Sequence, residues 1–133
     1  MKKVAACFLI FLNINFLHSQ NTKIDSLKNL LAAAKDDSTR LSIYAGSVWL
    51  STWSNPAEAL QLANQELLFA KKAKLINAEA IALGDIANVL SVLGDYSQSI
   101  DYFLQSIKLS EKFGLASPLQ FGYLNISEAY SDA

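Results

Sequence analysis

The sequence of 133 residues has little histidine and little cysteine, with one of each. Both residues, Cys7 and His18, lie among the first 20 residues, so residues 21–133 have neither of the ligands that zinc and other soft metals prefer. We therefore expect no disulfide, no metal and no cofactor in that part of the chain. Two prolines and five glycines leave long stretches free to form helix at little intrinsic cost.

Motifs that carry chemistry are also missing. Residues 21–133 contain no G-x-S-x-G or H-E-x-x-H motif and no glycine-rich phosphate loop. The adjacent carboxylates Asp36 and Asp37 have the composition of an acid/base pair, but a helix N-cap and its neighbour explain them better. We expect that the chain is not an enzyme.

The N-terminus has the pattern of a secretory signal peptide. Lys2 and Lys3 precede an apolar run over 4–17, and a short polar stretch follows over 18–20. The run of about 14 residues is shorter than the ~20 that cross a bilayer as a helix. We predict a signal peptide over 1–20 and export to the periplasm or the extracytoplasmic face of the membrane; an uncleaved signal anchor is the alternative.

The charge of the remaining segment, 21–133, argues against nucleic acid as a partner. Loss of Lys2 and Lys3 leaves 9 basic residues against 12 acidic ones, so the formal charge is −3. The basic residues cluster only at Lys71, Lys72 and Lys74, which suit the carbonyl end of a helix. No membrane span is predicted within 21–133, whereas an anchor beyond residue 133 stays open.

A repeat of about 40 residues is the strongest pattern in the chain. In the first helix of each unit, apolar and small residues recur on one face: Ile43, Leu83 and Tyr123; Gly46, Ile86 and Ile126; Ser47, Ala87 and Ser127; Leu50, Leu90 and Tyr130. In the second helix the pairs are Ala59 with Ser99, Leu60 with Ile100, Ala63 with Phe103, and Leu67 with Ile107. Equivalent residues are expected in equivalent surroundings.

Helix starts and ends repeat with the same period. Side chains that suit an N-cap align at Asp37, Asn77 and Ser117, and capping boxes are predicted at Asn55 with Glu58 and at Asp95 with Gln98. Gly114 is expected to end a helix in the left-handed conformation, and Gly94 to form a tight turn. Together the two patterns predict a leading helix over 22–34, then helices over 38–53, 56–74, 78–93 and 96–113, and a last helix from 118 to the end.

The second unit resembles the tetratricopeptide repeat. The resemblance lies in its small residues, its Gly-Asp-Tyr turn and its aromatic position: Leu83, Ile86, Ala87, Leu90, Gly94, Asp95, Tyr96, Ser99, Ile100 and Phe103. The first unit keeps the small position at Ala59 but replaces the turn with Ser54, Asn55 and Pro56. The repeat and the resemblance together predict an all-α, right-handed α-solenoid of antiparallel helix pairs, with about two and a half repeats of 40 residues after the leading helix.

The resemblance implies a module over 21–133 that binds protein or peptide segments. Its repeat of 40 residues, its export signal and its opening over 23–37 make it similar to the extracytoplasmic repeat regions of Bacteroidetes-type membrane sensor proteins. The alternative function is therefore the sensory region of a larger histidine kinase, cyclase or DNA-binding response protein. The last helix lacks a second helix to cover Tyr123, Ile126 and Tyr130, so we expect a chain that is truncated at its C-terminus.

The concave side formed by the first helices is the expected binding surface. The repeat pattern assigns eight residues to it: Tyr44, Val48, Ile81, Gly84, Asn88, Ser91, Leu124 and Glu128. Trp49 and Trp53, four residues apart on one helical stripe, have two interpretations. They form either an aromatic ligand platform or, as we favour because they align with apolar Val89 and Leu93, part of the core.

Overall fold

The computed structural model describes residues 26–133 and divides the chain into two compact units, 1–35 and 36–133. Within the first unit, residues 26–33 are helical, so the predicted leading helix is present over that part. Its predicted start and the predicted signal peptide lie outside the described residues.

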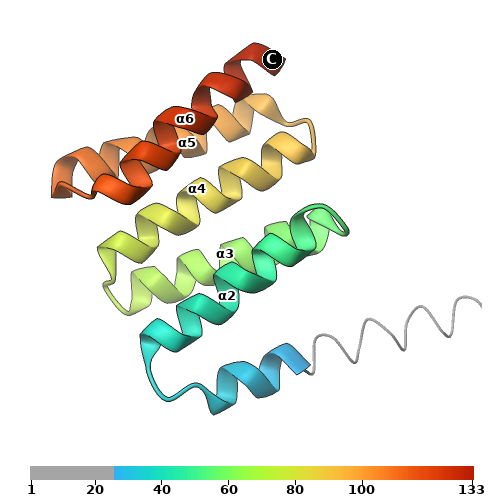
Figure 1. Cartoon of the computed structure of the whole chain (residues 1–133), viewed down its shortest axis with the longest axis vertical. Helices are drawn as coiled ribbons and strands as arrows, with labels where there is room; N and C mark the ends of the chain where they lie inside the picture. The colour runs from blue at the N-terminus through green and yellow to red at the C-terminus, as the bar shows by residue number, and fades with distance from the viewer. Residues whose placement is uncertain (1–25) are drawn as a thin grey trace, which may run out of the picture. The chain divides into compact units, whose positions relative to one another are not determined.

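Five helices make up the second unit (Figure 1). They are α2 (Asp37–Thr52), α3 (Pro56–Lys72), α4 (Ile76–Val92), α5 (Tyr96–Phe113) and α6 (Ala116–Asp132). Each begins and ends within two residues of its predicted bounds, and residues 26–133 contain no strand. The prediction of an all-α helical repeat is confirmed.

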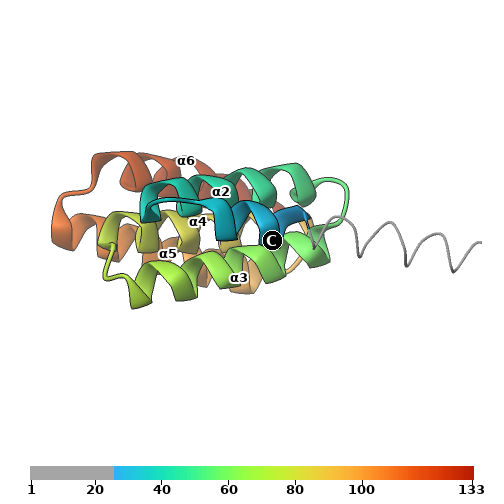
Figure 2. The same ribbon diagram turned by 90° about the horizontal axis from the view of Figure 1, so that it is seen from below.

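The helices of the second unit form two layers (Figures 1 and 2). Turns of two or three residues join them, so consecutive helices pack as antiparallel neighbours. The first helices α2, α4 and α6 lie in one layer, where α4 contacts both of the others, and α3 and α5 lie in the second layer. Because neighbours make contact within the first layer and not within the second, the array curves toward the first helices.

N-cap side chains fix the starts of the two second helices. Asn55 accepts a hydrogen bond from the backbone N–H of Glu58, and its amide donates to the Glu58 carboxylate over 3.0 Å. Asp95 accepts from the backbone N–H of Gln98 and from its side-chain amide. Both predicted N-caps are confirmed, and each satisfies a helix donor that otherwise lacks a partner. The reciprocal bond of a capping box does not form, because the backbone N–H groups of Asn55 and Asp95 donate to Ser51 and Leu90 of the preceding helices.

The predicted caps Asn77 and Ser117 are wrong by two residues. Helices α4 and α6 have Leu75 and Leu115 at the N-cap position, and neither makes a side-chain capping bond. Each leucine follows a residue with positive φ, Lys74 or Gly114, which reverses the chain at once. The next helix therefore begins before the polar residue, with the leucine side chain half-buried in the turn.

Small residues allow the two layers to approach closely. The equivalent residues Ala59 and Ser99 are both fully buried, as is Ala87 on α4. Their small side chains bring helices together while larger residues fill the adjoining space. The core cluster between α4, α5 and α6 comprises Ala87, Phe103, Ile107, Ile126 and Ala129.

Equivalent positions differ at the ends of the second unit. Leu90 on the central helix α4 is 5% exposed, whereas Leu50 on α2 is 77% exposed. Helix α4 contacts α2, α3, α5 and α6, but α2, the first helix of the unit, contacts α3 and α4 alone within it. On α6, Ile126 is buried, and Tyr123 and Tyr130 are exposed. The expectation of equivalent surroundings thus fails for the outer faces of the terminal helices.

Lys74 is expected to weaken the end of α3. It has φ of 58°, the left-handed conformation that glycine takes at Gly114, forty residues later. The two turns share their hydrogen bonds, with Leu75 N–H donating to Ala70 and Leu115 N–H to Ser110, both over 2.9 Å. Since a β-carbon destabilises this conformation, Lys74→Gly should raise the free energy of unfolding by about 1 kcal/mol.

Urea unfolding at constant ionic strength measures this change. The reciprocal variant, Gly114→Lys, is the matched control and should lower the stability by a similar amount, because it introduces the same strain in the equivalent turn. If Lys74→Gly and the unaltered protein have equal stability, the conformation of Lys74 does not destabilise the protein.

Candidate functional site

A groove runs between the first helices of the second unit. It encloses about 460 Å³. Most of its lining comes from α2, α4 and α6, and α5 contributes one residue. The lining residues are Trp49, Trp53, Asn88, Ser91, Val92, Phe103, Phe121, Asn125, Glu128 and Asp132. A volume of this size lies within the range of ligand sites in proteins.

The two tryptophans form the wall of the groove on α2. Trp49 is 65% exposed and Trp53 is 69% exposed, so our preference for a core role is wrong. Trp49 lies in the last turn of α2 and Trp53 is the C-cap of that helix, so the four-residue spacing places both on one stripe, which borders the groove. Their neighbours Val48 and Thr52 take the buried positions instead. The aromatic platform is the interpretation that agrees with the exposure.

Phenylalanines on two helices form the floor. Phe103 of α5 is buried, and the centre of its ring lies 6.3 Å from that of Phe121 on α6. The Phe121 ring lies against Gly84 of α4, where an added β-carbon would lie 3.1 Å from the ring. The absence of a side chain at Gly84 thus allows Phe121 to rest on α4, and the floor joins three helices.

The polar residues of the groove are amides, a hydroxyl and two carboxylates. Ser91 shares a 2.7 Å hydrogen bond with Ser99 of α5, and the Asn125 amide donates to the Phe121 carbonyl. Glu128 and Asp132 are exposed on α6. No lysine or arginine is among the lining residues, so the groove combines aromatic surface with negative charge.

The eight residues predicted for the binding surface divide into two groups. Asn88, Ser91 and Glu128 line the groove. The other five do not: Val48 and Gly84 are buried, Tyr44 and Ile81 are half-buried, and Leu124 is exposed outside the groove. The Tyr44 ring packs 6.1 Å from that of Phe69 on α3, between the layers. The prediction is wrong for Val48 and Gly84, because both are buried and a partner could not contact them.

The two tryptophans were missed for one reason. The repeat pattern assigns the same face to every first helix, but α2 presents Trp49 and Trp53, one position after Val48 and Thr52. A helix at the end of a unit packs against fewer neighbours, so it need not present the same face as a central one. In the sequence, the signal for Trp49 and Trp53 was two aromatic residues four apart. The signal for Asp132 was its spacing of four from Glu128.

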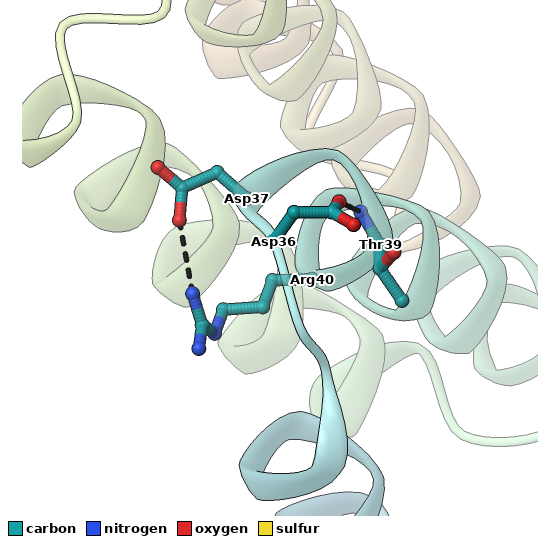
Figure 3. A network of polar contacts seen from close by, with 4 residues as sticks. All are labelled: Asp36, Asp37, Thr39 and Arg40. Atoms are coloured by element: carbon teal, nitrogen blue, oxygen red, sulfur yellow. Dashed lines mark hydrogen bonds and ion pairs between the residues drawn. The ribbon is translucent and has the colours of Figure 1, made fainter.

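Asp36 and Asp37 act at a helix start (Figure 3). Asp36 is the N-cap of α2 and accepts a hydrogen bond from the Thr39 backbone N–H over 2.7 Å, which lowers the pKa of its carboxyl. Asp37, in the first turn, forms an ion pair with Arg40 over 3.0 Å. The predicted cap and its neighbour therefore exchange roles: Asp36, and not Asp37, is the cap.

A second pair of carboxylates lies away from the groove, between α3 and α4. Glu66 is 2% exposed, and its Oε2 atom has no hydrogen-bond partner. Burial raises the pKa of Glu66 to about 8, and the charge of Asp85 adds to the shift. Burial also raises the pKa of Asp85, to about 7. The equivalent of Glu66 in the next unit is the neutral Ser106, whose hydroxyl donates to the Ala80 carbonyl over 2.7 Å.

Within residues 26–133, no three His, Cys, Asp or Glu side chains are close enough together to hold a metal ion. None of the helices described is both long and apolar enough to cross a membrane. Comparisons of the chain with protein-family models, with curated proteins and with solved structures found no match.

Proposed function

We propose that this protein is an exported scaffold of the tetratricopeptide-repeat type, which binds a protein or peptide segment in the groove between α2, α4 and α6 and catalyses no reaction. The observation that carries the proposal is the pair of exposed tryptophans on the groove wall, Trp49 and Trp53. Tryptophan is the residue type most enriched among those that dominate binding energy at interfaces. A large aromatic surface left in water at two successive turns of one helix supports a binding role.

The shape of the groove supports a peptide as the ligand. It extends across three helices in one layer, with amides on α4 and α6 that can pair with a peptide backbone. The phenylalanine floor offers apolar surface for a side chain. The same groove would serve either an independent scaffold or the sensory region of a larger signalling protein, so both functions share this binding step.

The test is selection of short random peptides displayed on phage against the whole chain, with the selected peptides resynthesised in dye-labelled form. Their affinities are measured by fluorescence polarisation. Trp49→Ala and Trp53→Ala should each weaken binding by roughly 30-fold, the loss typical of an interface hot spot. Because the chain has two tryptophans and both line the groove, unlabelled peptide should also change the tryptophan emission.

Leu68→Ala is the matched control. Leu68 on α3 is 69% exposed, the same fraction as Trp53, but it does not line the groove. All three variants should keep the stability of the unaltered protein within about 0.5 kcal/mol, since the residues are exposed. Selection of no peptide, or equal affinity of the tryptophan variants and Leu68→Ala, would overturn the proposal.

A further inference from the structure

Two carboxylates that line the groove, the acidic pair Glu128 and Asp132, repel each other. Glu128 and Asp132 are four residues apart on α6, so two like charges face the same side of the helix. Neither carboxylate has an ion pair or hydrogen bond within the described residues. A cation bound here would relieve this repulsion.

The opposite wall of the same groove also favours a cation. Trp49 and Trp53 expose aromatic surface into the cavity that Glu128 and Asp132 line. The face of an indole ring attracts a positive charge, and tryptophan does so most strongly of the aromatic residues. With no lysine or arginine among the lining residues, nothing from the groove itself supplies that charge.

We propose that the groove selects a peptide segment with an arginine side chain, whose guanidinium lies between the tryptophan wall and the acidic pair. This inference rests on the proposed function and names the partner of the same groove. Arginine fits better than lysine because its planar guanidinium both stacks on an aromatic ring and donates paired hydrogen bonds to a carboxylate. Asn88, which has no hydrogen bond within the described residues, is available to the peptide backbone.

The test compares arginine with citrulline, its neutral analogue of nearly the same shape. Peptides from the phage selection are resynthesised with each arginine replaced in turn by citrulline, lysine or glutamate, and binding to the whole chain is measured by fluorescence polarisation. One arginine should prove essential, with about tenfold or greater loss on change to citrulline. Lysine should restore part of the affinity and glutamate none.

Variants of the protein locate the arginine. The double variant Glu128→Gln, Asp132→Asn should bind the arginine peptide about tenfold more weakly and the citrulline peptide with unchanged affinity. Asp101→Asn, on an exposed part of α5 outside the groove, is the control and should change neither. Raising the salt concentration should weaken the binding of the arginine peptide more than that of the citrulline peptide.

The possible failures are distinguishable. If peptides bind through Trp49 and Trp53 but arginine and citrulline bind equally, this inference is overturned and the proposed function stands. If the double variant still prefers arginine over citrulline, the inference is also overturned, because another part of the protein then recognises the charge. If no peptide binds, the proposed function and this inference fall together.

Discussion

The free energy of unfolding of this protein should fall by at least about 2 kcal/mol as the pH rises from 5 to 8. The cause is the carboxyl pair between α3 and α4. Burial and the neighbouring charge raise the pKa of Glu66 from 4.5 to about 8, and burial raises the pKa of Asp85 from 3.8 to about 7. Both groups therefore bind protons more tightly in the folded protein than in the unfolded chain.

The sign follows from that difference. Below about pH 3 both groups are protonated in the folded and the unfolded states, and the contribution of the pair to stability is fully present. Between pH 5 and pH 8 the unfolded chain has released these protons, so unfolding releases protons and becomes easier as the pH rises. The other shifted carboxyl, Asp36, has a lowered pKa and acts below pH 4, and the raised pKa of Tyr123 acts above pH 10. Among the described residues, the window from pH 5 to 8 thus isolates the pair.

Urea unfolding across this pH range measures the effect. Glu66→Gln keeps the size of the side chain and removes its charge, so it should raise stability at pH 8 by about 2 kcal/mol and change it little at pH 5. Combined with Asp85→Asn, it should abolish most of the pH dependence between 5 and 8.

Asp101→Asn is the control for loss of a carboxylate at the surface, and it should preserve the pH dependence of the unaltered protein, because Asp101 is exposed on α5. A flat profile in the unaltered protein, or a double variant with the same slope, would contradict the account of Glu66 and Asp85.

Gly122→Ala should lower the free energy of unfolding by about 1 to 3 kcal/mol, although alanine is the better helix former. Gly122 is buried in α6 where that helix meets α5, and an added β-carbon would lie 2.6 Å from Cγ1 of Ile107. Ile107 is itself 6% exposed and belongs to the core cluster, so it has little space to move. Either α6 shifts outward or Ile107 leaves its preferred rotamer.

Gly46→Ala is the matched control for this prediction. Gly46 lies in α2, is exposed, and has no atom within 4 Å of the position that a β-carbon would take. The same change should therefore stabilise the protein there by about 0.5 to 1 kcal/mol, the difference in helix propensity. Thermal unfolding of Gly122→Ala and Gly46→Ala measures both changes in stability. Changes of the same sign would show that α5 and α6 do not approach as closely as described.

Periodicity predicted the helices well because burial along a helix depends on spacing, which the sequence shows directly. The small residues Ala59 and Ser99 marked the close approach of helices, and Asn55 and Asp95 marked helix starts through the capping bonds they form. Asn77 and Ser117 misled the prediction because Lys74 and Gly114 reverse the chain so sharply that each following helix begins at once.

The groove was predicted less completely than the helices. Asn88, Ser91 and Glu128 were placed in it by the repeat, whereas Trp49 and Trp53 were assigned to the core. A large apolar side chain is buried or exposed according to which helices lie against it, and the repeat pattern treats all units alike. The raised pKa of Glu66 likewise depends first on its burial and then on the charge of Asp85, a residue on another helix that no local pattern connects with it.

The sequence by itself determined the number, length and order of the helices in the second unit, since these depend on spacing and on local capping. Only the tertiary structure decided which faces remain open: that Trp49 and Trp53 border a groove with Glu128 and Asp132, and that Glu66 is buried beside Asp85. Exposure and charge at those positions depend on which helices pack together, and that packing joins residues distant in the chain.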